Sequence, residues 1–224
     1  MLTLAFESSA KPASVAVCSE EVLLGQYFQN SGLTHSRTLL AMAESLLRNL
    51  DLSVSDIELV SVARGPGSFT GVRIGVSAAK GLAWGLDVPI CGVSSLEAMA
   101  YQVQTEQALI CPVMDARRGQ VYNGVFRWDG GNLARIREDR AISLEDLASD
   151  IASFGLPVLL LGDGAEISWE HFAGNGLDCE MAPVLLRYQT AYGVALAALK
   201  GTRIPPIDLE PSYLRPSQAE RELG

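Results

Sequence analysis

Short apolar runs separated by polar turns open the chain and have the lengths of β-strands. Residues 2–6 form the first run, which ends at Glu7 before a polar turn. Residues 14–18 return as a second run, and a third extends from about residue 21 to 29. Apolar runs bounded by turn residues are typical of strands, so we predict a hairpin extended by a third strand.

Apolar positions with helical spacing follow this predicted hairpin. Thr34 is placed to cap a helix from His35 to about Asn49, because a threonine at this position can accept a hydrogen bond from the first helical turn. The apolar stripe of this helix is wider than a helix covering one neighbour requires. It consists of Leu39, Ala43, Leu46 and Leu50, flanked by Leu40, Met42 and Leu47.

A glycine-rich loop joins the next strand and helix. Residues 59–63 form a short apolar run that enters Arg64-Gly-Pro-Gly-Ser-Phe-Thr-Gly-Val-Arg73, and a helix is predicted from this loop to about Leu86. Ser94 and Glu97 have the spacing of a capping box, which predicts a further helix to about Gln104.

The second half of the chain begins with the same order of signals. Residues 109–114 form an apolar run that ends in Asp115, and a strand is predicted to return over 121–128 after a polar turn. Ser143 with Asp146 is placed to cap a helix to about residue 153.

A strand at 158–161 then enters the sequence Gly162-Asp-Gly164. Residues 187–200 are predicted to be helical with Gly201 as the stop, and the proline-rich tail after Ile204 is expected to pack as extended chain.

This repetition predicts an internal duplication. Glu7 and Asp115 each end a strand before a polar turn, and each half has a Gly-x-Gly that follows an apolar strand. We therefore predict an α/β fold of two βββαβα-like units, in two lobes with mixed sheets and flanking helices. The first lobe would span 1–104, completed by the returning tail 188–224, and the second 105–187.

The turns of the two halves are candidate phosphate-binding loops. Backbone N–H groups at turns and helix starts attract anions, and these turns would face a cleft between the halves. The alternative is that the glycines only permit tight turns. The candidate residues are Glu7, Ser8, Ser9, Gly65, Gly67, Ser68, Thr70, Arg73, Asp115, Gly162 and Gly164.

The charge balance disfavours independent binding to nucleic acid. The chain has 17 basic and 26 acidic residues and a net charge of −9, whereas neutralising phosphates requires a cluster of Lys and Arg. The densest basic group is Arg135, Arg137 and Arg140, which Glu138 and Asp139 dilute, and we predict a solvated face there. Any contact with tRNA is therefore expected to be indirect.

Targeting signals are not evident in the sequence. The start has no basic segment before an apolar one, and no window approaches 18 apolar residues, so we expect neither secretion nor a membrane span. Cys18, Cys91, Cys111 and Cys179 are far apart and form no C-x-x-C, which favours reduced thiols in a cytoplasmic protein.

Several motifs together resemble the TsaB (YeaZ) family across essentially the whole chain. The most specific is the loop Arg64–Gly75, supported by Leu4–Ser9, Gly92–Glu97, Asp115–Tyr122 and Pro211–Arg215. The resemblance implies the duplicated actin-like, ribonuclease H-like (ASKHA) fold of the acetate-kinase, Hsp70 and actin superfamily. The family commonly has Asp where this chain has Glu7, and the longer side chain would displace a carboxylate that positions Mg–nucleotide in relatives.

The resemblance also implies a function without catalysis by this chain. The family supports synthesis of N6-threonylcarbamoyladenosine (t6A) at position 37 of tRNA as a non-catalytic paralogue and partner of the transferase TsaD, with the ATPase TsaE completing the machinery. It belongs to the branch called glycoprotease-like, or peptidase M22-like. No cofactor is expected to be required, although weak ATP or ADP binding at a partner interface is open.

The side chains themselves give no set that would run chemistry alone. Catalytic relatives hold a metal through His-x-x-x-His, but four residues after His35 stands Leu39, and the only other histidine is His171, so we predict no metal site. Ser68 is not in Gly-x-Ser-x-Gly, and its loop lacks the Gly-Lys-Ser/Thr of a Walker motif. Two alternatives stay open: an ATP-dependent small-molecule kinase or ATPase using Asp115 or Asp163, and a glycoprotease-like metallopeptidase.

The helix predicted from the glycine-rich loop to about Leu86 contains several glycines, which indicates a close packing partner. Each interior glycine costs about 1 kcal/mol of helix stability relative to alanine, so several need compensation from packing. That partner is either the chain's own sheet or a second protein, and the resemblance favours TsaD, or a second copy when TsaD is absent. The candidate docking residues are His35, Leu39, Met42, Leu46, Gly71, Ile74, Gly75, Ala78 and Leu82.

Overall fold

The computed structural model describes residues 1–215, and contacts divide the chain into two units. The first unit joins Met1–Ala98 to Gln189–Ser212, and the second comprises Met99–Tyr188 with the tail from Tyr213. The predicted lobe boundary at residue 104 lies a few residues beyond this division. Residues 213–215 group with the second unit instead of the first, and the remainder of the predicted returning tail, 216–224, lies outside the described residues.

The first unit contains a five-stranded mixed sheet with the strand order β3-β2-β1-β4-β5. The first three strands pair antiparallel, which confirms the predicted hairpin and third strand, while β4 and β5 run parallel to β1. Strands β1, β2 and β4 are apolar on both faces because both faces of the sheet are covered. The bounds are β1 Leu2–Glu7, β2 Ala13–Ser19, β3 Val22–Gln29, β4 Leu59–Ala63 and β5 Ile90–Val93.

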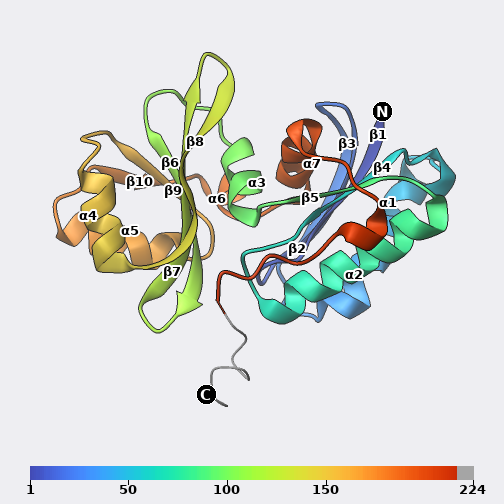
Figure 1. Ribbon diagram of the computed structural model, residues 1–224, viewed down its shortest axis with the longest axis horizontal. Helices are drawn as coiled ribbons and strands as arrows, with labels where there is room; N and C mark the ends of the chain where they lie inside the picture. Colours follow the sequence, from blue (N-terminus) through green and yellow to red (C-terminus); the bar gives the residue numbers. More distant parts are fainter. Residues whose placement is uncertain (216–224) are drawn as a thin grey trace. The chain divides into compact units, whose positions relative to one another are not determined.

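Helices cover the two faces of this sheet (Figure 1). α1 (His35–Asn49) and α2 (Phe69–Leu86) are in contact with each other on one face, and α7 (Ala191–Lys200) packs on the other. The apolar side chains between α1, α2 and the strands form the main core of the unit, and their removal from water is the dominant favourable term in its folding. Two short 3-10 turns, η1 (Val54–Asp56) and η2 (Pro206–Asp208), complete the unit.

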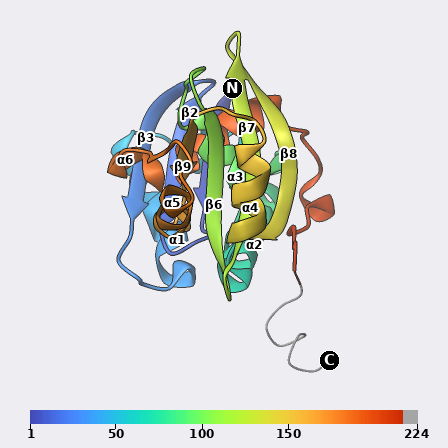
Figure 2. The same cartoon turned by 90° about the vertical axis from the view of Figure 1, so that its left-hand side faces the viewer.

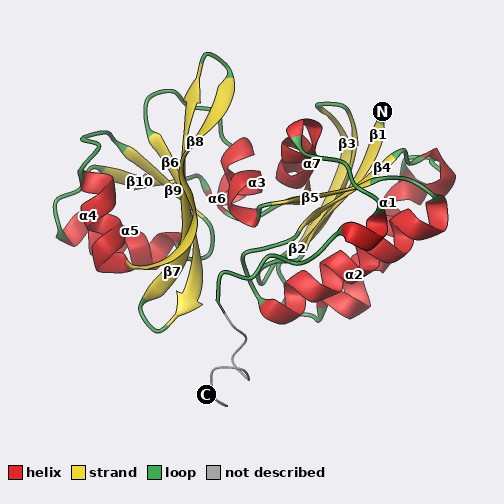
Figure 3. Ribbon diagram, viewed as in Figure 1, coloured by secondary structure: helices red, strands yellow, loops and turns green. Residues whose placement is uncertain are grey.

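The second unit repeats this topology. Its sheet has the order β10-β9-β6-β7-β8, with β6, β7 and β8 antiparallel and β9 and β10 parallel to β6 (Figure 3). In each unit the first three strands form an antiparallel meander, and the last two continue the sheet on the other side of its first strand, which is β1 or β6. This shared topology confirms the predicted duplication. The bounds are β6 Leu109–Arg117, β7 Gln120–Asp129, β8 Asn132–Ser143, β9 Val158–Leu161 and β10 Cys179–Met181.

Two helices pack together over one face of this second sheet (Figure 2). They are α4 (Leu144–Ala152), which the Ser143 hydroxyl caps by accepting from the Asp146 N–H as predicted, and α5 (Ala165–Gly174). The unit also contains the one-turn helix α6 (Val184–Arg187), while α3 (Ser95–Tyr101) crosses the division between the units. No helix within residues 1–215 is long and apolar enough to cross a membrane.

Some helix ends differ from the prediction. Thr34 stands at the N-terminus of α1, but its side chain makes no capping hydrogen bond, so α1 is held by its buried apolar residues. The helix predicted over 187–200 is interrupted, because Thr190 caps a new helix by accepting from the Gly193 N–H at 3.4 Å.

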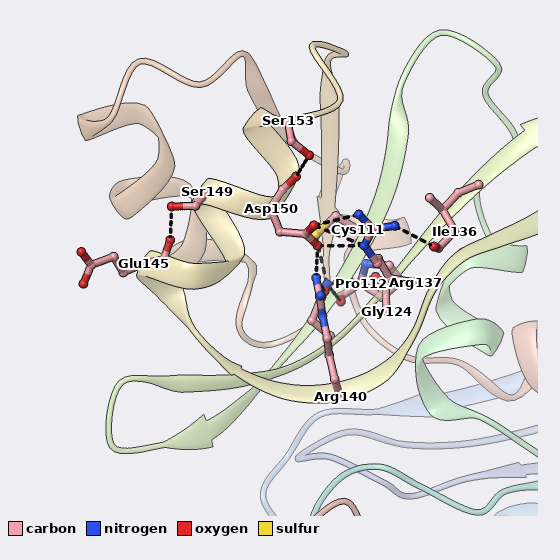
Figure 4. Close-up of polar contacts among 11 residues, drawn as sticks. Cys111, Pro112, Gly124, Ile136, Arg137, Arg140, Glu145, Ser149, Asp150 and Ser153 are labelled. Atoms are coloured by element: carbon pink, nitrogen blue, oxygen red, sulfur yellow. Dashed lines mark hydrogen bonds and ion pairs between the residues drawn. The ribbon is translucent and has the colours of Figure 1, made fainter.

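The third strand that the repeat implies for the second unit, β8, was given no residue range from the sequence, and it carries the arginine group that we expected to form a solvated face. Arg137 and Arg140 instead both pair with Asp150 of α4, the first at 2.9 Å (Figure 4). Arg140 also lies 3.4 Å from the side-chain oxygen of the buried Asn123. These side chains are partly buried, so the prediction is wrong: the arginines fasten β8 to the helix beside it.

We expect Asp150→Asn to weaken this attachment in a pH-dependent way. Desolvation acts to raise the pKa of Asp150, but hydrogen bonds and charges from Arg137 and Arg140 outweigh it and hold the pKa below its ordinary value. The carboxylate therefore stabilises the fold above its ordinary pKa of about 4, and this contribution disappears as the pH falls through the lower folded value. Denaturant unfolding should show a loss of about 1 kcal/mol at pH 7, where solvent screens the pair, and a smaller loss near pH 3. An equal loss at both values would contradict this account.

Candidate functional site

The first candidate phosphate loop, the turn after β1, is buried and bonded to its own chain. The Glu7 carboxylate accepts from the Ser9 N–H at 2.5 Å, and the Ser8 hydroxyl donates to the Gly71 carbonyl at 2.9 Å. Glu7, Ser8 and Ser9 have no exposed surface. The turn therefore does not present these groups to a ligand in this structure, and the predicted phosphate contact at these three residues is wrong for it.

The glycine-rich loop that follows β4 covers this turn. The Ser68 N–H donates to the Ser9 carbonyl at 2.6 Å, and a Cβ on Gly67 would lie 2.2 Å from that same oxygen. Gly65 has φ +116 and would place a Cβ 2.3 Å from the Ser212 carbonyl, so both glycines are required by close backbone approach. The alternative reading of these glycines, as residues that permit tight turns and contacts, describes the observed loop.

The remaining residues of this loop begin α2. Ser68 caps the helix by accepting from the Gly71 N–H at 3.3 Å. Thr70 and Arg73 are exposed, and the Arg73 guanidinium lies 3.8 Å from the centre of the Phe69 ring. The Ser68 side chain thus provides a hydrogen-bond acceptor for one of the backbone N–H groups in the first turn of α2.

The corresponding loops of the second unit bring two carboxylates together. The Asp115 N–H donates to the Asp163 side chain at 3.3 Å, and Arg117 pairs with Asp115 at 3.6 Å. Gly162, at φ +95, would place a Cβ 2.0 Å from the Val113 carbonyl, and Gly164 packs against the Asp115 backbone. Within residues 1–215, no group of three or more His, Cys, Asp or Glu side chains is arranged to hold a metal ion.

Four of the candidate docking residues belong to the interior of the first unit. Leu39 and Leu46 are buried in its core, and the glycines of α2 face the β1 turn. A Cβ on Gly71 would lie 2.2 Å from the Ser8 carbonyl, and one on Gly75 would lie 2.3 Å from the Ser8 hydroxyl. The small residues therefore permit approach of this chain's own strand, and their assignment to a docking face is wrong.

His35 is likewise engaged inside the chain. Its Nε2 lies 2.8 Å from the Ala10 carbonyl, which ties the start of α1 to the turn after β1. His171 lies on α5 in the second unit, with its ring edge-on to Phe172. The two histidines thus belong to different units.

The other candidate docking residues lie on α1 and α2, and one of them, Leu82, lines a groove between these helices. Ile74, Ala78 and Leu82 are half-buried and recur every fourth residue along one side of α2, while Met42 is half-buried on α1. We call the adjoining hollow the α1–α2 groove. It has a volume of about 570 Å³ and is lined by Leu4, Leu40, Ala43, Glu44, Leu47, Arg48, Asp51, Leu52, Ser53, Val54 and Leu82.

Two exposed apolar residues of α1 and α2 were missing from the predicted set. Leu40, which lines the groove, is 52% exposed, and Trp84, which lines a different hollow beside residues 203–207, is 65% exposed. Leu40 was visible in the sequence as a flank of the wide stripe on α1, whereas Trp84 had no signal beyond its type. An exposed leucine that lines an apolar groove favours a protein contact on this face of the first unit.

Comparison with known proteins identifies the family. The family model for TsaD, tRNA N6-adenosine threonylcarbamoyltransferase, matches residues 29–169. A Bacillus subtilis tRNA threonylcarbamoyladenosine biosynthesis protein TsaB is 40% identical over 72% of this chain and 71% of its own. The Haemophilus influenzae TsaB is 35% identical over 95% of this chain and 92% of its own. The chain belongs to the TsaB family.

The fold of the TsaB family is also the one observed here. The crystal structure described as YeaZ from Pseudomonas aeruginosa superimposes with a TM-score of 0.77 at 26% identity, covering 95% of this chain and 99% of that one. The predicted duplicated actin-like (ASKHA) fold is confirmed by this likeness together with the repeated sheets. The predicted family and fold class are therefore both established.

Proposed function

We propose that this chain is the non-catalytic subunit of a complex that makes t6A at position 37 of tRNA, in the cytoplasm. It would bind a TsaD-like transferase through the α1–α2 groove and the adjoining row Ile74, Ala78 and Leu82. Membership of the TsaB family supports the pathway, since the relatives are tRNA threonylcarbamoyladenosine biosynthesis proteins.

The single observation that carries the non-catalytic role is that the residues of the turn after β1 are buried. In this turn Glu7, Ser8 and Ser9 are buried; Ser8 and Ser9 hydrogen-bond to Gly71 and Ser68 of the glycine-rich loop, and Glu7 accepts from the Ser9 N–H. A group that activates or positions a substrate must reach it, and these hydrogen bonds are to the chain's own backbone. The exposed apolar groove on the neighbouring helices supports a role in binding instead.

The other members of the assembly follow from this role. A TsaE-like ATPase would join the same complex, and two copies of this chain would pair through the α1–α2 groove when the transferase is absent. No cofactor is required by the chain itself, and any weak binding of ATP or ADP would occur where it meets a partner. Contact with tRNA would come mainly through the transferase, because the net charge of −9 opposes independent binding.

Two measurements test the proposal. Deleting the chain's gene should remove t6A from digested tRNA, detected by mass spectrometry of the nucleosides, and restoring the gene should return it. A mixture of the purified chain and a TsaD-like transferase should elute from a sizing column as one complex. Retention of t6A in the deletion strain, or separate elution of the two proteins, would count against the proposed function.

A further inference from the structure

The turn between β6 and β7 holds two arginines in an unfavourable backbone conformation. β6 ends at Arg117, β7 begins at Gln120, and the two-residue loop between them is Arg118-Gly119. Arg117, Arg118 and Gly119 have φ values of +67, +58 and +71. Such values are ordinary for glycine and tolerated by asparagine or aspartate, which dominate two-residue hairpin loops of this kind. Folding alone would therefore favour other residues at both arginine positions.

The guanidinium groups of Arg117 and Arg118 gain little stabilisation from contacts with the rest of the chain. The Arg117 side chain is 86% exposed, and its ion pair with Asp115, at 3.6 Å, is at the surface. Arg118 is exposed as well. Surface ion pairs contribute little to stability, so neither arginine is explained by what it does for the fold. The strain is better explained by a contact with another molecule.

A third arginine adds to the charge at this turn. Arg215 donates a hydrogen bond from Nη1 to the Ala116 carbonyl at 3.2 Å, which brings its guanidinium to the residue preceding Arg117. Asp115 and Asp163 lie beside the turn and are linked at 3.3 Å through the Asp115 N–H, and Glu145 and Asp146 follow Leu144, whose N–H donates to the Gly119 carbonyl at 3.4 Å. The three guanidiniums therefore gather at the end of this hairpin with carboxylates of the same unit beside them, in a chain whose overall charge is −9.

The chemistry of the turn fits phosphate better than a protein surface. The planar guanidinium fork matches phosphate oxygens, and two exposed arginines at a hairpin tip can approach a nucleic-acid backbone from outside. Arginine is also common in protein interfaces, but there it accompanies buried apolar or aromatic anchors, and Ala116, the apolar residue that precedes Arg117, is buried in this chain. Two arginines are too few for independent binding, but they would extend the basic surface of a partner.

We propose that Arg117 and Arg118 contact backbone phosphates of the tRNA on which the complex acts. This inference rests on the proposed function, because it is the transferase that would bring the RNA to the chain. It assigns to the second unit a direct contact with the substrate, whereas the α1–α2 groove on the first unit serves the protein partner.

The test compares two double variants in complex with a TsaD-like transferase. Arg117→Asn with Arg118→Asn removes both charges and places residues that tolerate positive φ, so the turn should remain intact. Arg127→Gln with Arg203→Gln removes two charges from exposed positions elsewhere and is the matched control. Binding of labelled tRNA is followed by fluorescence anisotropy over a range of salt concentrations, and thermal unfolding checks that both variants are folded.

The turn variant should bind tRNA about tenfold more weakly at low salt, and the slope of log affinity against log salt should fall by about 1.5. The control should keep the affinity and slope of the wild type. Equal behaviour of the two double variants would overturn the proposal. So would a turn variant that keeps its tRNA affinity but loses ATP binding by the complex, or one that no longer joins the transferase.

Failure of the proposed function can be distinguished from failure of the tRNA contact at this turn. If the wild-type chain does not join the transferase on a sizing column, the docking proposal fails before RNA is added. The turn is then tested by ultraviolet cross-linking of tRNA to the isolated chain at low salt. Cross-links at residues 115–122 that the turn variant loses and the control keeps would support the contact, and cross-links unchanged by the variant would overturn it.

Discussion

Ala78→Arg is expected to weaken binding of a TsaD-like transferase by about 100-fold. Ala78 is half-buried in the row beside the α1–α2 groove, so a partner covering that row would have to enclose the bulky, charged guanidinium and remove it from water. Enclosing an unpaired charge costs several kcal/mol, and about 3 kcal/mol corresponds to the expected factor. Isothermal titration of the variant against the transferase measures it directly.

A matched control and a second variant protect this experiment from a folding artefact. Ala173→Arg places the same side chain on an exposed position of α5 in the other unit and should leave affinity unchanged. Leu40→Glu alters a residue that is already 52% exposed, so the fold should tolerate it while binding weakens. If all three variants bind as the wild type does, the α1–α2 groove is not the docking surface.

Gly71→Ala should destabilise the first unit by about 3 kcal/mol, the upper part of the range for overpacked cores. The added methyl would lie 2.2 Å from the Ser8 carbonyl, which is backbone and held by the hydrogen bonds of the β1 turn. The helix or the turn must therefore move. Equilibrium unfolding in denaturant gives the change in the free energy of unfolding.

The control for this prediction lies on the same helix and should have the opposite sign. A Cβ on Gly81 would meet no atom within 4 Å, so Gly81→Ala should add about 0.5–1 kcal/mol through helix propensity alone. A Gly71 variant as stable as the wild type would show that α2 does not need this close approach. If both substitutions raised the free energy of unfolding, helix propensity, and not packing, would determine the outcome.

Sequence patterns predicted the elements whose signals are local. The strands β1 to β4, β6, β7 and β9, the cap formed by Ser143 and the duplication follow from short runs, turn residues and their order, whereas the short strands β5 and β10 were not predicted. The bounds of strand β8 were not predicted because Arg137 and Arg140 interrupt its apolar pattern. Their ion-pair partner, Asp150, lies on the helix that follows. Pairing across elements of this kind leaves no trace in local hydropathy.

The candidate docking residues show the same limit. The apolar stripe on α1 was visible, but only the sheet beneath decides that Leu39 is buried while Leu40 faces outward. Two of the glycines of α2, Gly71 and Gly75, indicated a close neighbour, whereas Gly81 and Gly85 meet no atom within 4 Å, and the sequence left open whether the neighbour belonged to this chain or another. The structure identifies it as Ser8, so four of the nine predicted docking residues belong to the interior.

The order in which the chain is made has a consequence for how it folds. The second unit is nearly continuous in sequence, whereas one face of the first sheet is covered by α7, which is synthesised after the second unit. We expect the emerging first half to keep the side of β1 and β4 that meets α7 open until nearly the whole polypeptide has left the ribosome. A stalled or truncated translation product that ends before residue 191 would therefore display an uncovered apolar sheet, and should be a preferred substrate for chaperones and proteases.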